Sequence, residues 1–363
     1  MTQFPILDDR PQAACGPLRV KRPYQKRLTR DRSQAVRRAV QICFLLLNIW
    51  IGAQFYLFVR QFETFDVQLR WSRPPGIEGW LPIAGLMNLK AFIMTGQIPL
   101  IHPAAMFLIA TFLVMSLLLR KAFCGWLCPV GTISEWLWKT GRETFGRNFA
   151  LPRWADIPLR SLKYILMGLF LWVVITMPVA AIESFLHSPY GLIADVKMLN
   201  FLRYLGATAA VVIGGLALAS IFVRNFWCRY LCPYGALTGL AALLSPVWIR
   251  RRPEKCIDCA KCAKACPSHL PVDTNLTIRS AECLGCLECV AVCPAEGALD
   301  LSVLGRRPLG RIRTEPLWIA SVLALVFVSV IGYAKLSGHW DSPIPAEWYQ
   351  RLIPYAAEYD HPR

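Results

Sequence analysis

Eight cysteines in two short runs carry the clearest chemistry in this sequence. The runs are Cys256-x-x-Cys259-x-x-Cys262-x-x-x-Cys266-Pro267 and Cys283-x-x-Cys286-x-x-Cys289-x-x-x-Cys293-Pro294. Thiolate sulfur is the soft ligand that iron–sulfur clusters require. Two-residue gaps let three sulfurs from one tight loop reach three corners of a cubane, so the runs predict two [4Fe–4S] clusters.

The two runs also predict which cysteines share a cluster. In two-cluster ferredoxins the fourth cysteine of each run, just before proline, ligates the other cluster. The predicted sets are Cys256, Cys259, Cys262 and Cys293 for the first cluster, and Cys283, Cys286, Cys289 and Cys266 for the second. Zinc sites rarely use four cysteines in one such run, and disulfides are disfavoured on a cytoplasmic face.

The elements that position these cysteines are predicted to lie in a membrane. Of the 363 residues 55% are hydrophobic and only 17% are charged. Apolar runs of about 20 residues, enough to cross a bilayer, predict five spans, at 39–59, 100–119, 162–183, 205–223 and 316–335. Two apolar stretches broken by proline, glycine and charge, at 77–95 and 188–203, predict re-entrant or interfacial segments on one face. A shorter apolar stretch, 235–249, is expected at the interface.

The distribution of positive charge predicts the orientation of the chain. With the N-terminus inside, 31 of the 40 Lys and Arg residues fall in inner segments. This is the positive-inside pattern. It places the basic leader and the two cysteine runs in the cytoplasm, and the C-terminus outside. The formal net charge of +17 therefore indicates membrane orientation, and we expect no nucleic-acid partner because no basic stripe carries interleaved aromatics.

A second cysteine motif occurs twice in the membrane part. Cys124-x-x-x-Cys128-Pro129 reappears 104 residues later as Cys228-x-x-x-Cys232-Pro233, each after a predicted span. Two such units in parallel orientation predict a pseudo-two-fold axis along the membrane normal. Three interpretations of the four thiols stay open: a shared metal or third Fe–S centre, a redox-active dithiol, or buried cysteines that pack two helix starts.

Ionisable residues on the predicted outer side suggest a place for a quinol. A quinol site needs a proton acceptor and a hydrogen-bond donor, which His102, His187 and Glu183 could supply. The alternative is that these groups are merely solvated at helix ends. Bis-histidine haem is not expected, since His102 lies only at the opening of a predicted span and no second histidine lies within the spans.

With both kinds of cysteine motif considered, the chain resembles the NapH/NosR/CcoG-type bacterial membrane polyferredoxins, over roughly residues 39–310. It is most similar to the minimal NapH-like core: its predicted outer loops cannot hold an FMN domain, and too few residues follow the last span for an immunoglobulin-like domain. The resemblance implies electron transfer in a bacterial cytoplasmic membrane, with quinol and other redox proteins as partners. It supports the eight ferredoxin cysteines as cluster ligands.

These observations predict a polytopic α-helical membrane bundle with an inserted α+β two-cluster ferredoxin domain. The predicted parts are a basic cytoplasmic leader (1–38), a duplicated transmembrane domain (39–249), the ferredoxin domain (250–310), and a last span with a short outer tail (311–363). We predict an electron-transfer protein, such as a subunit of a quinol dehydrogenase, that links the quinone pool or a redox partner to another redox protein. The alternative is a maturation factor that supplies electrons to reduce or load another enzyme's metal centre.

Overall fold

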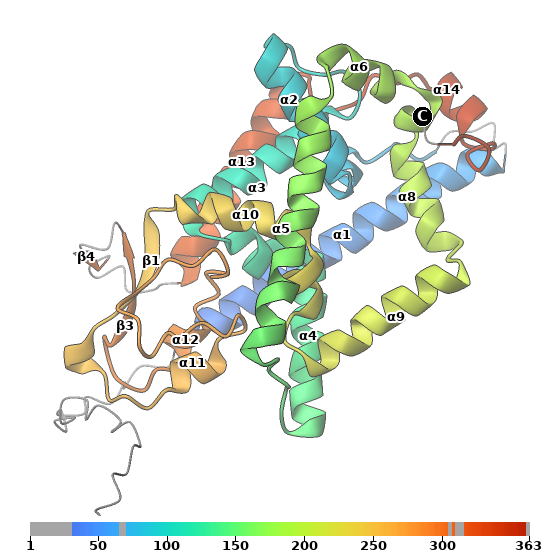
Figure 1. Ribbon diagram of the computed structural model, residues 1–363. Coiled ribbons are helices and arrows are strands. Elements are labelled where there is room, and N and C mark those ends of the chain that lie inside the picture. The colour runs from blue at the N-terminus through green and yellow to red at the C-terminus, as the bar shows by residue number, and fades with distance from the viewer. Residues whose placement is uncertain (1–30, 65–69, 304–306, 309–315, 361–363) are drawn as a thin grey trace, which may run out of the picture.

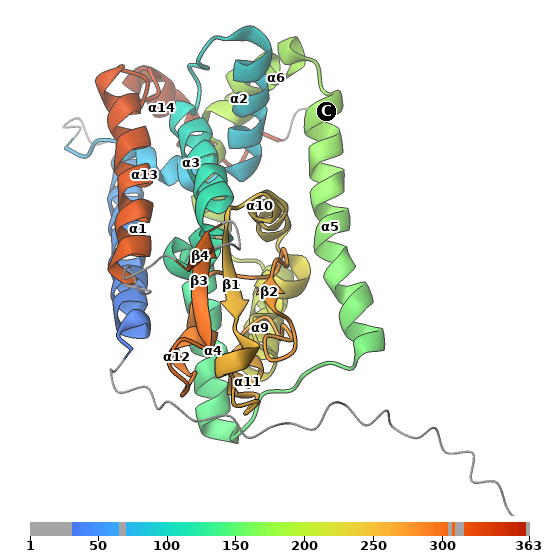
Figure 2. The ribbon, with the colours of Figure 1, turned by 90° about the vertical axis from the view of Figure 1, so that its left-hand side faces the viewer.

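The protein is a bundle of helices with a small antiparallel sheet at one end (Figures 1 and 2). The computed structural model describes residues 31–64, 70–303, 307–308 and 316–360. Most of the predicted leader, 1–30, therefore lies outside the described residues. The first helix already begins at Ser33, ahead of the boundary expected after residue 38.

Five long helices correspond to the five apolar runs. They are α1 (Ser33–Glu63), α3 (Pro103–Leu119), α5 (Arg153–Thr176), α9 (Ala207–Phe222) and α13 (Pro316–Leu336). By length and composition three of them, α1, α5 and α13, could cross a membrane, and a fourth span arises if α9 is taken with α8 (Ala194–Arg203), from which it is bent by 81°. The 17-residue α3 is about 25 Å long, short of the ~30 Å hydrocarbon core. The five-span count therefore stays a prediction.

Shorter helices connect these long ones. They are α2 (Pro82–Thr95), α4 (Pro129–Phe145), α6 (Val179–His187), α7 (Pro189–Leu192), α10 (Pro233–Leu243), α11 (Lys261–Ala265), α12 (Glu288–Ala291) and α14 (Ala346–Leu352), with the single turns η1 (Pro75–Trp80), η2 (Phe123–Leu127), η3 (Trp227–Leu231) and η4 (Pro253–Lys255). Proline begins many of them, because its fixed φ suits the first helical position and its missing N–H is not needed there. The helix α5 ends at Thr176, whereas the predicted span continued to residue 183. Pro178 explains the difference, because proline disfavours a helical conformation in the residue before it.

The sheet has the strand order β2-β1-β3-β4 with antiparallel neighbours. Its strands are β1 (Val247–Arg251), β2 (Thr277–Ile278), β3 (Leu299–Val303) and β4 (Arg307–Pro308). The predicted boundary between the transmembrane domain and the ferredoxin domain, at 249/250, falls inside β1. Ile249 of this strand pairs with both Ile278 and Leu301. Of the apolar stretch 235–249, residues up to Leu243 belong to α10 and only the last three residues lie in β1, where the alternate residues Val247 and Ile249 are buried.

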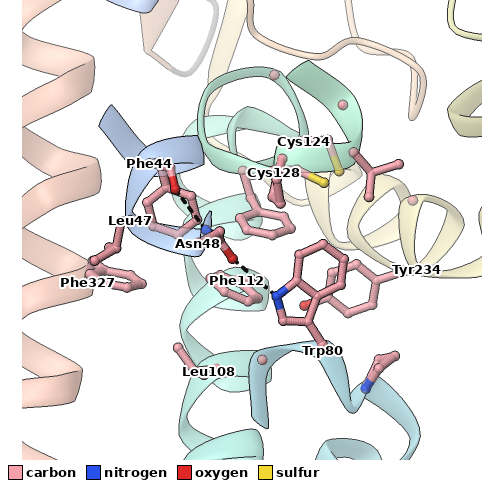
Figure 3. A pocket seen from close by; sticks show the side chains of 18 of the residues that line it. Phe44, Leu47, Asn48, Trp80, Leu108, Phe112, Cys124, Cys128, Tyr234 and Phe327 are labelled. Atoms are coloured by element: carbon pink, nitrogen blue, oxygen red, sulfur yellow. Dashed lines mark hydrogen bonds between the residues drawn. The ribbon is translucent and has the colours of Figure 1, made fainter. Parts of the chain in front are cut away.

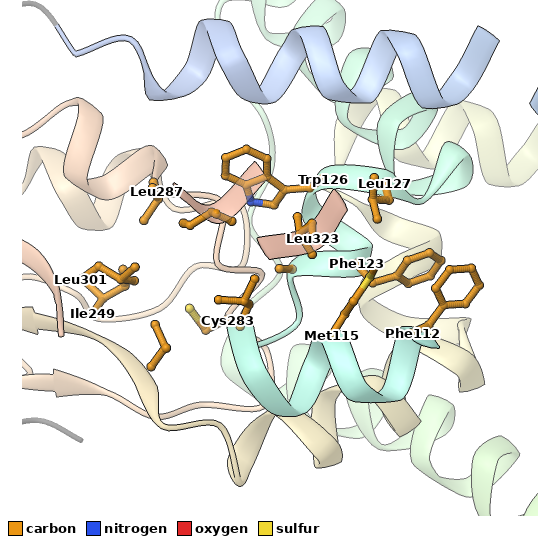
Figure 4. Close-up of a cluster of buried hydrophobic side chains, with 14 of the residues drawn as sticks. Phe112, Met115, Phe123, Trp126, Leu127, Ile249, Cys283, Leu287, Leu301 and Leu323 are labelled. Atoms are coloured by element: carbon orange, nitrogen blue, oxygen red, sulfur yellow. The ribbon is translucent and has the colours of Figure 1, made fainter. Parts of the chain in front are cut away.

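One hydrophobic core joins the ferredoxin unit to the membrane helices. Ile249 and Leu301 of the sheet, and Cys283 and Leu287 of the cysteine loops, belong to the same buried cluster as Trp126 (Figure 4). The cluster continues through Phe123 and Met115 to Leu323 of α13. The ferredoxin unit is thus packed rigidly against the bundle rather than tethered to it.

Candidate iron–sulfur centres

The first predicted cluster set surrounds one small cavity at the edge of the molecule. It is lined by Cys256 and Cys259 from the loop before α11, by Cys262 of α11, and by Cys293, which follows α12. Asp258 donates its backbone N–H to the Cys256 sulfur at 3.4 Å, the kind of bond that stabilises a thiolate ligand. Cys259 is exposed, so this cavity lies close to solvent.

The second predicted set surrounds a second small cavity, deeper in the protein. Its four cysteines line that cavity and are all buried: Cys266, Cys283, Cys286 and Cys289. Leu270 donates its backbone N–H to the Cys266 sulfur at 3.5 Å. The donor chemistry and the cavities suit two cubanes, while the individual ligand assignments remain predictions.

The two ferredoxin loops have the same backbone course. Asp258 and Ala260 have left-handed φ angles of 53° and 54°, and 27 residues later Gly285 and Leu287 have φ angles of 60° and 56°. Such angles are uncommon for residues other than glycine. They turn each of the two loops back on itself at equivalent positions.

The four membrane cysteines line a single, larger cavity. Cys124, Cys128, Cys228 and Cys232 all contribute to its wall. Each pair spans one π-helical turn, η2 or η3, and its second cysteine directly precedes the proline that begins α4 or α10. Gly235 donates its backbone N–H to the Cys232 sulfur at 3.2 Å. The two copies of the motif therefore share a local structure.

The chemistry of these four thiols suits an iron–sulfur centre. Among the described residues no three His, Cys, Asp or Glu side chains are close enough to ligate a single metal ion, and this holds equally for the eight ferredoxin cysteines. The sulfur-only donor set is also that of an iron–sulfur centre.

The loop of the second cluster set is packed directly on the membrane motif. A Cβ added to Gly125, between Cys124 and Cys128, would lie 2.6 Å from the backbone oxygen of Leu284, between Cys283 and Cys286. Next to this contact the Trp126 indole N–H donates to the Gly285 carbonyl at 3.1 Å. The two cysteine-bearing turns thus touch through their backbones.

The second copy of the motif approaches the same loop. A Cβ on Gly239 of α10 would lie 2.8 Å from the Ala281 backbone oxygen. Arg120, just before the first copy, donates to the Ser280 carbonyl at 2.5 Å. The segment 280–286 therefore lies against both copies of the motif.

Buried ion pairs hold this arrangement together, and sequence reasoning missed them. Lys163 of α5 is fully buried and donates to both oxygens of Glu282 at 2.6 Å. The guanidinium of Arg37, in α1, contacts Glu135 at 2.6 Å and Glu288 at 3.2 Å. The available signal was a basic residue within or beside an apolar helix, which is costly unless it is paired.

Glu135 is ionised in this setting. Burial alone would raise the pKa of Glu135, but the adjacent Arg37 and Lys139 lower it to about 2. Gln41 also donates to the carboxylate at 3.1 Å. A charged carboxylate thus joins α4 to α1.

On the opposite side of the bundle His102 lies in a buried ionic cluster. Arg73 contacts Glu78 at 2.8 Å and Asp195 at 2.7 Å, and both carboxylates are fully buried. His102 Nε2 lies 2.8 Å from the Gly191 carbonyl, so this nitrogen carries a hydrogen. Its Nδ1 lies 3.3 Å from Glu78.

The other two residues of the proposed quinol site lie elsewhere. Glu183 and His187 are exposed on α6, where His187 Nδ1 lies 2.8 Å from the Glu183 carbonyl. No described contact joins either of them to His102. The structure therefore does not bring the three residues together.

Comparison with known protein families agrees with the iron–sulfur chemistry. A family described as "4Fe-4S binding domain" matches residues 101–149 and again 205–255, and one described as "4Fe-4S dicluster domain" matches residues 248–299. The first matches cover the two copies of the membrane cysteine motif, and the last covers the ferredoxin runs. No solved structure matches the chain. The fold and the sites define a membrane-associated iron–sulfur electron-transfer protein.

Proteins of similar sequence show the family to which the chain belongs. The chain is 50% identical over 328 residues to "Putative electron transport protein YccM" of Escherichia coli (strain K12), covering 90% of this chain and 91% of the relative. It is 32% identical to the regulatory protein NosR of Pseudomonas aeruginosa over 44% of this chain and 22% of NosR. It is 27% identical to the ferredoxin-type protein NapH of E. coli over 41% of this chain and 48% of NapH. The chain belongs to the NapH/NosR-type membrane polyferredoxins.

Proposed function

We propose that this protein carries electrons between a soluble redox partner and the membrane interior through three iron–sulfur centres. The eight ferredoxin cysteines hold two [4Fe–4S] clusters, and the four membrane cysteines hold a third centre, which supplies one-electron redox chemistry when bound. The contact of Gly125 with Leu284 is the observation that carries this proposal. It brings the turn between Cys283 and Cys286 against the turn between Cys124 and Cys128.

The exposure of the ferredoxin cysteines, together with the contact between Gly125 and Leu284, supports an order for the three centres. The set containing Cys259 is nearest to solvent, the set containing Cys289 is buried, and the membrane set lies beyond it. Exposed Lys255, Lys261 and Lys264 surround the first set. This basic face would attract an acidic redox protein.

We also propose the cytoplasmic location of the ferredoxin unit, five spans and a pseudo-two-fold axis. The bias of Lys and Arg towards the predicted inner segments supports the orientation. The matching turns η2 and η3, each followed by a proline-initiated helix, support the duplication. The single family that matches both halves points the same way.

The membrane end of this chain of centres is proposed to exchange electrons with the quinone pool. The relatives' names support electron transport, and the apolar surroundings of the membrane cysteines suit a lipid-soluble carrier.

Low-temperature EPR of the anaerobically purified protein tests the proposal. We expect signals from reduced clusters after addition of a menaquinol analogue or of dithionite. Signals that appear only with dithionite would reject the exchange with quinol and favour a protein donor at the basic face. Iron for only two clusters, with no change on replacing the membrane cysteines, would reject the third centre.

A further inference from the structure

The cavity that contains the membrane cysteines extends well beyond them. Its volume is about 480 Å³, and most of the residues that line it are not cysteines. From Cys124 and Cys128 it runs past α3 and α1 towards η1 (Figure 3). Its wall beyond the cysteines is apolar and aromatic, formed among others by Phe44, Leu47, Leu108, Phe112 and Phe327.

Polar groups interrupt this apolar wall, and the lining also includes the charged residues Lys121, Glu135 and Lys335. Asn48 donates to the Phe44 carbonyl at 2.8 Å and accepts from the Trp80 indole N–H at 3.2 Å, and its second amide hydrogen has no hydrogen-bond partner among the described residues. The Tyr234 hydroxyl makes no hydrogen bond to any described residue. Asn225 is 7% exposed, and its side-chain oxygen has no partner within the described part of the chain.

The rim of the cavity faces the surface that would contact lipid. Leu47 is 37% exposed and Trp80 is 38% exposed, and both belong to the lining. An apolar side chain of a bound molecule can leave between them. The occupant is therefore expected to come from the bilayer rather than from water.

We infer that this cavity binds the ring of an isoprenoid quinone, with the Tyr234 hydroxyl and the Asn48 amide directed at its oxygens. The apolar walls accept a flat ring, the sparse donors suit its two oxygens, and the rim leaves room for the prenyl chain. The cysteines at the inner end would lie next to the ring. Electron exchange at this site rests on the function proposed above, whereas binding does not.

The site differs from the one expected from the sequence. His102 is fully buried, and both of its ring nitrogens lie within reach of protein partners, Gly191 and Glu78. It is absent from the wall of this cavity, as are Glu183 and His187. The quinol site predicted from the outer-side residues and the cavity are therefore two different candidate sites.

Binding of a redox-inert quinol mimic to the purified, cluster-loaded full-length protein tests the inference. The probe is 2-heptyl-4-hydroxyquinoline N-oxide, whose fluorescence is quenched on binding. Leu47→Trp fills the cavity from its rim, and we expect it to abolish saturable quenching. Tyr234→Phe removes one hydrogen bond, so it should weaken binding about threefold to tenfold.

The matched control is Leu46→Trp, which adds the same bulk to the neighbouring position of α1, where the side chain is 59% exposed and outside the lining. It should bind the probe as the unaltered protein does. The inference is overturned if Leu47→Trp and Tyr234→Phe also bind normally, if binding responds instead to His187→Ala, or if no saturable binding occurs.

A separate readout distinguishes the inference from the proposed function. If menaquinol reduces the clusters equally well in Leu47→Trp, the exchange stands but its site is not this cavity. If the probe binds and Leu47→Trp abolishes that binding, yet menaquinol never reduces a cluster, the cavity binds the ring without electron exchange.

Discussion

The backbone oxygen of Leu284 lies 2.6 Å from the place that a Cβ atom on Gly125 would occupy. No side chain fits between these two residues, and each lies between two cysteines, one pair in the membrane motif and one in the ferredoxin loop. The contact therefore sets the separation of two candidate centres. Even a single methyl group added at Gly125 would therefore push these two segments apart.

Gly125→Ala should push the ferredoxin loop away from the membrane motif. Forcing one methyl group into a closed backbone contact costs about 1–3 kcal/mol. We expect all clusters to be retained, with a weaker magnetic interaction between the second cluster and the membrane centre and slower electron transfer between them. EPR line broadening and stopped-flow reduction measure both effects.

Gly168→Ala is the control for this substitution. Gly168 lies in α5 with no heavy atom within 4 Å of an added Cβ, so its variant should match the unaltered protein. An unchanged magnetic interaction in Gly125→Ala would show that the contact does not position the two centres.

Replacing the membrane cysteines should remove one centre and spare the other two. Cys124→Ser or Cys228→Ser is expected to lower the iron content from about twelve to about eight atoms per chain, with both ferredoxin EPR signals intact. Cys256→Ser should instead lose the first ferredoxin cluster and destabilise that unit, because cluster binding is part of its folding free energy.

Cys43→Ser is the matched control, since Cys43 is exposed on α1 and outside every cysteine-lined cavity described above. Its iron content and spectra should not change. If Cys124→Ser also keeps all its iron and its rate of electron transfer, the membrane cysteines are structural.

Lys163→Met should destabilise the junction between α5 and the ferredoxin loop. It removes the cationic partner of the Glu282 carboxylate, whose side chain is 11% exposed, and leaves the Tyr164 hydroxyl as a hydrogen-bond donor at 2.9 Å; breaking a buried pair in this way costs about 3–5 kcal/mol. Thermal unfolding in detergent, followed by loss of cluster absorbance, measures the change.

The double variant Lys163→Met with Glu282→Gln should recover part of this loss, because the buried carboxylate is neutralised together with its cationic partner. Arg60→Met removes one partner of an exposed pair with Glu63, 3.9 Å apart, and should cost less than about 1 kcal/mol. Equal losses in Lys163→Met and Arg60→Met would contradict the role of the buried pair.

Glu135→Gln should destabilise the protein at neutral pH. The folded-state pKa of Glu135, about 2, lies below its usual 4.5, so ionisation contributes about 3 kcal/mol above the unfolded pKa. This contribution is lost as the pH falls from about 4.5 towards 2. The difference in unfolding temperature between variant and unaltered protein should stay constant from pH 8 to about pH 5.

Glu143→Gln, on the exposed side of the same helix, is the control and should leave the unfolding temperature unchanged. A difference for Glu135→Gln that already disappears between pH 8 and pH 6 would show that the carboxylate is not held ionised by Arg37.

The sequence alone determined the chemistry of this protein, because that chemistry depends on local spacing. Three-residue steps between cysteines predict cubane ligation wherever the loop lies. A run of apolar residues predicts a buried or membrane helix from composition. The identity of the family and its electron-transfer class followed from these patterns, and the family comparisons confirmed them.

Only the tertiary structure decided how the parts meet. Gly125 and Leu284 are far apart in sequence, as are Lys163 and Glu282, and neither pair shows a local pattern. From the sequence, His102 was expected on the outer side, at the end of a predicted span, where a quinol could reach it. In the structure Arg73, Glu78 and Gly191 from other segments enclose it. Contacts and cavities between distant segments depend on how whole helices pack, and residue spacing along one segment does not encode that packing.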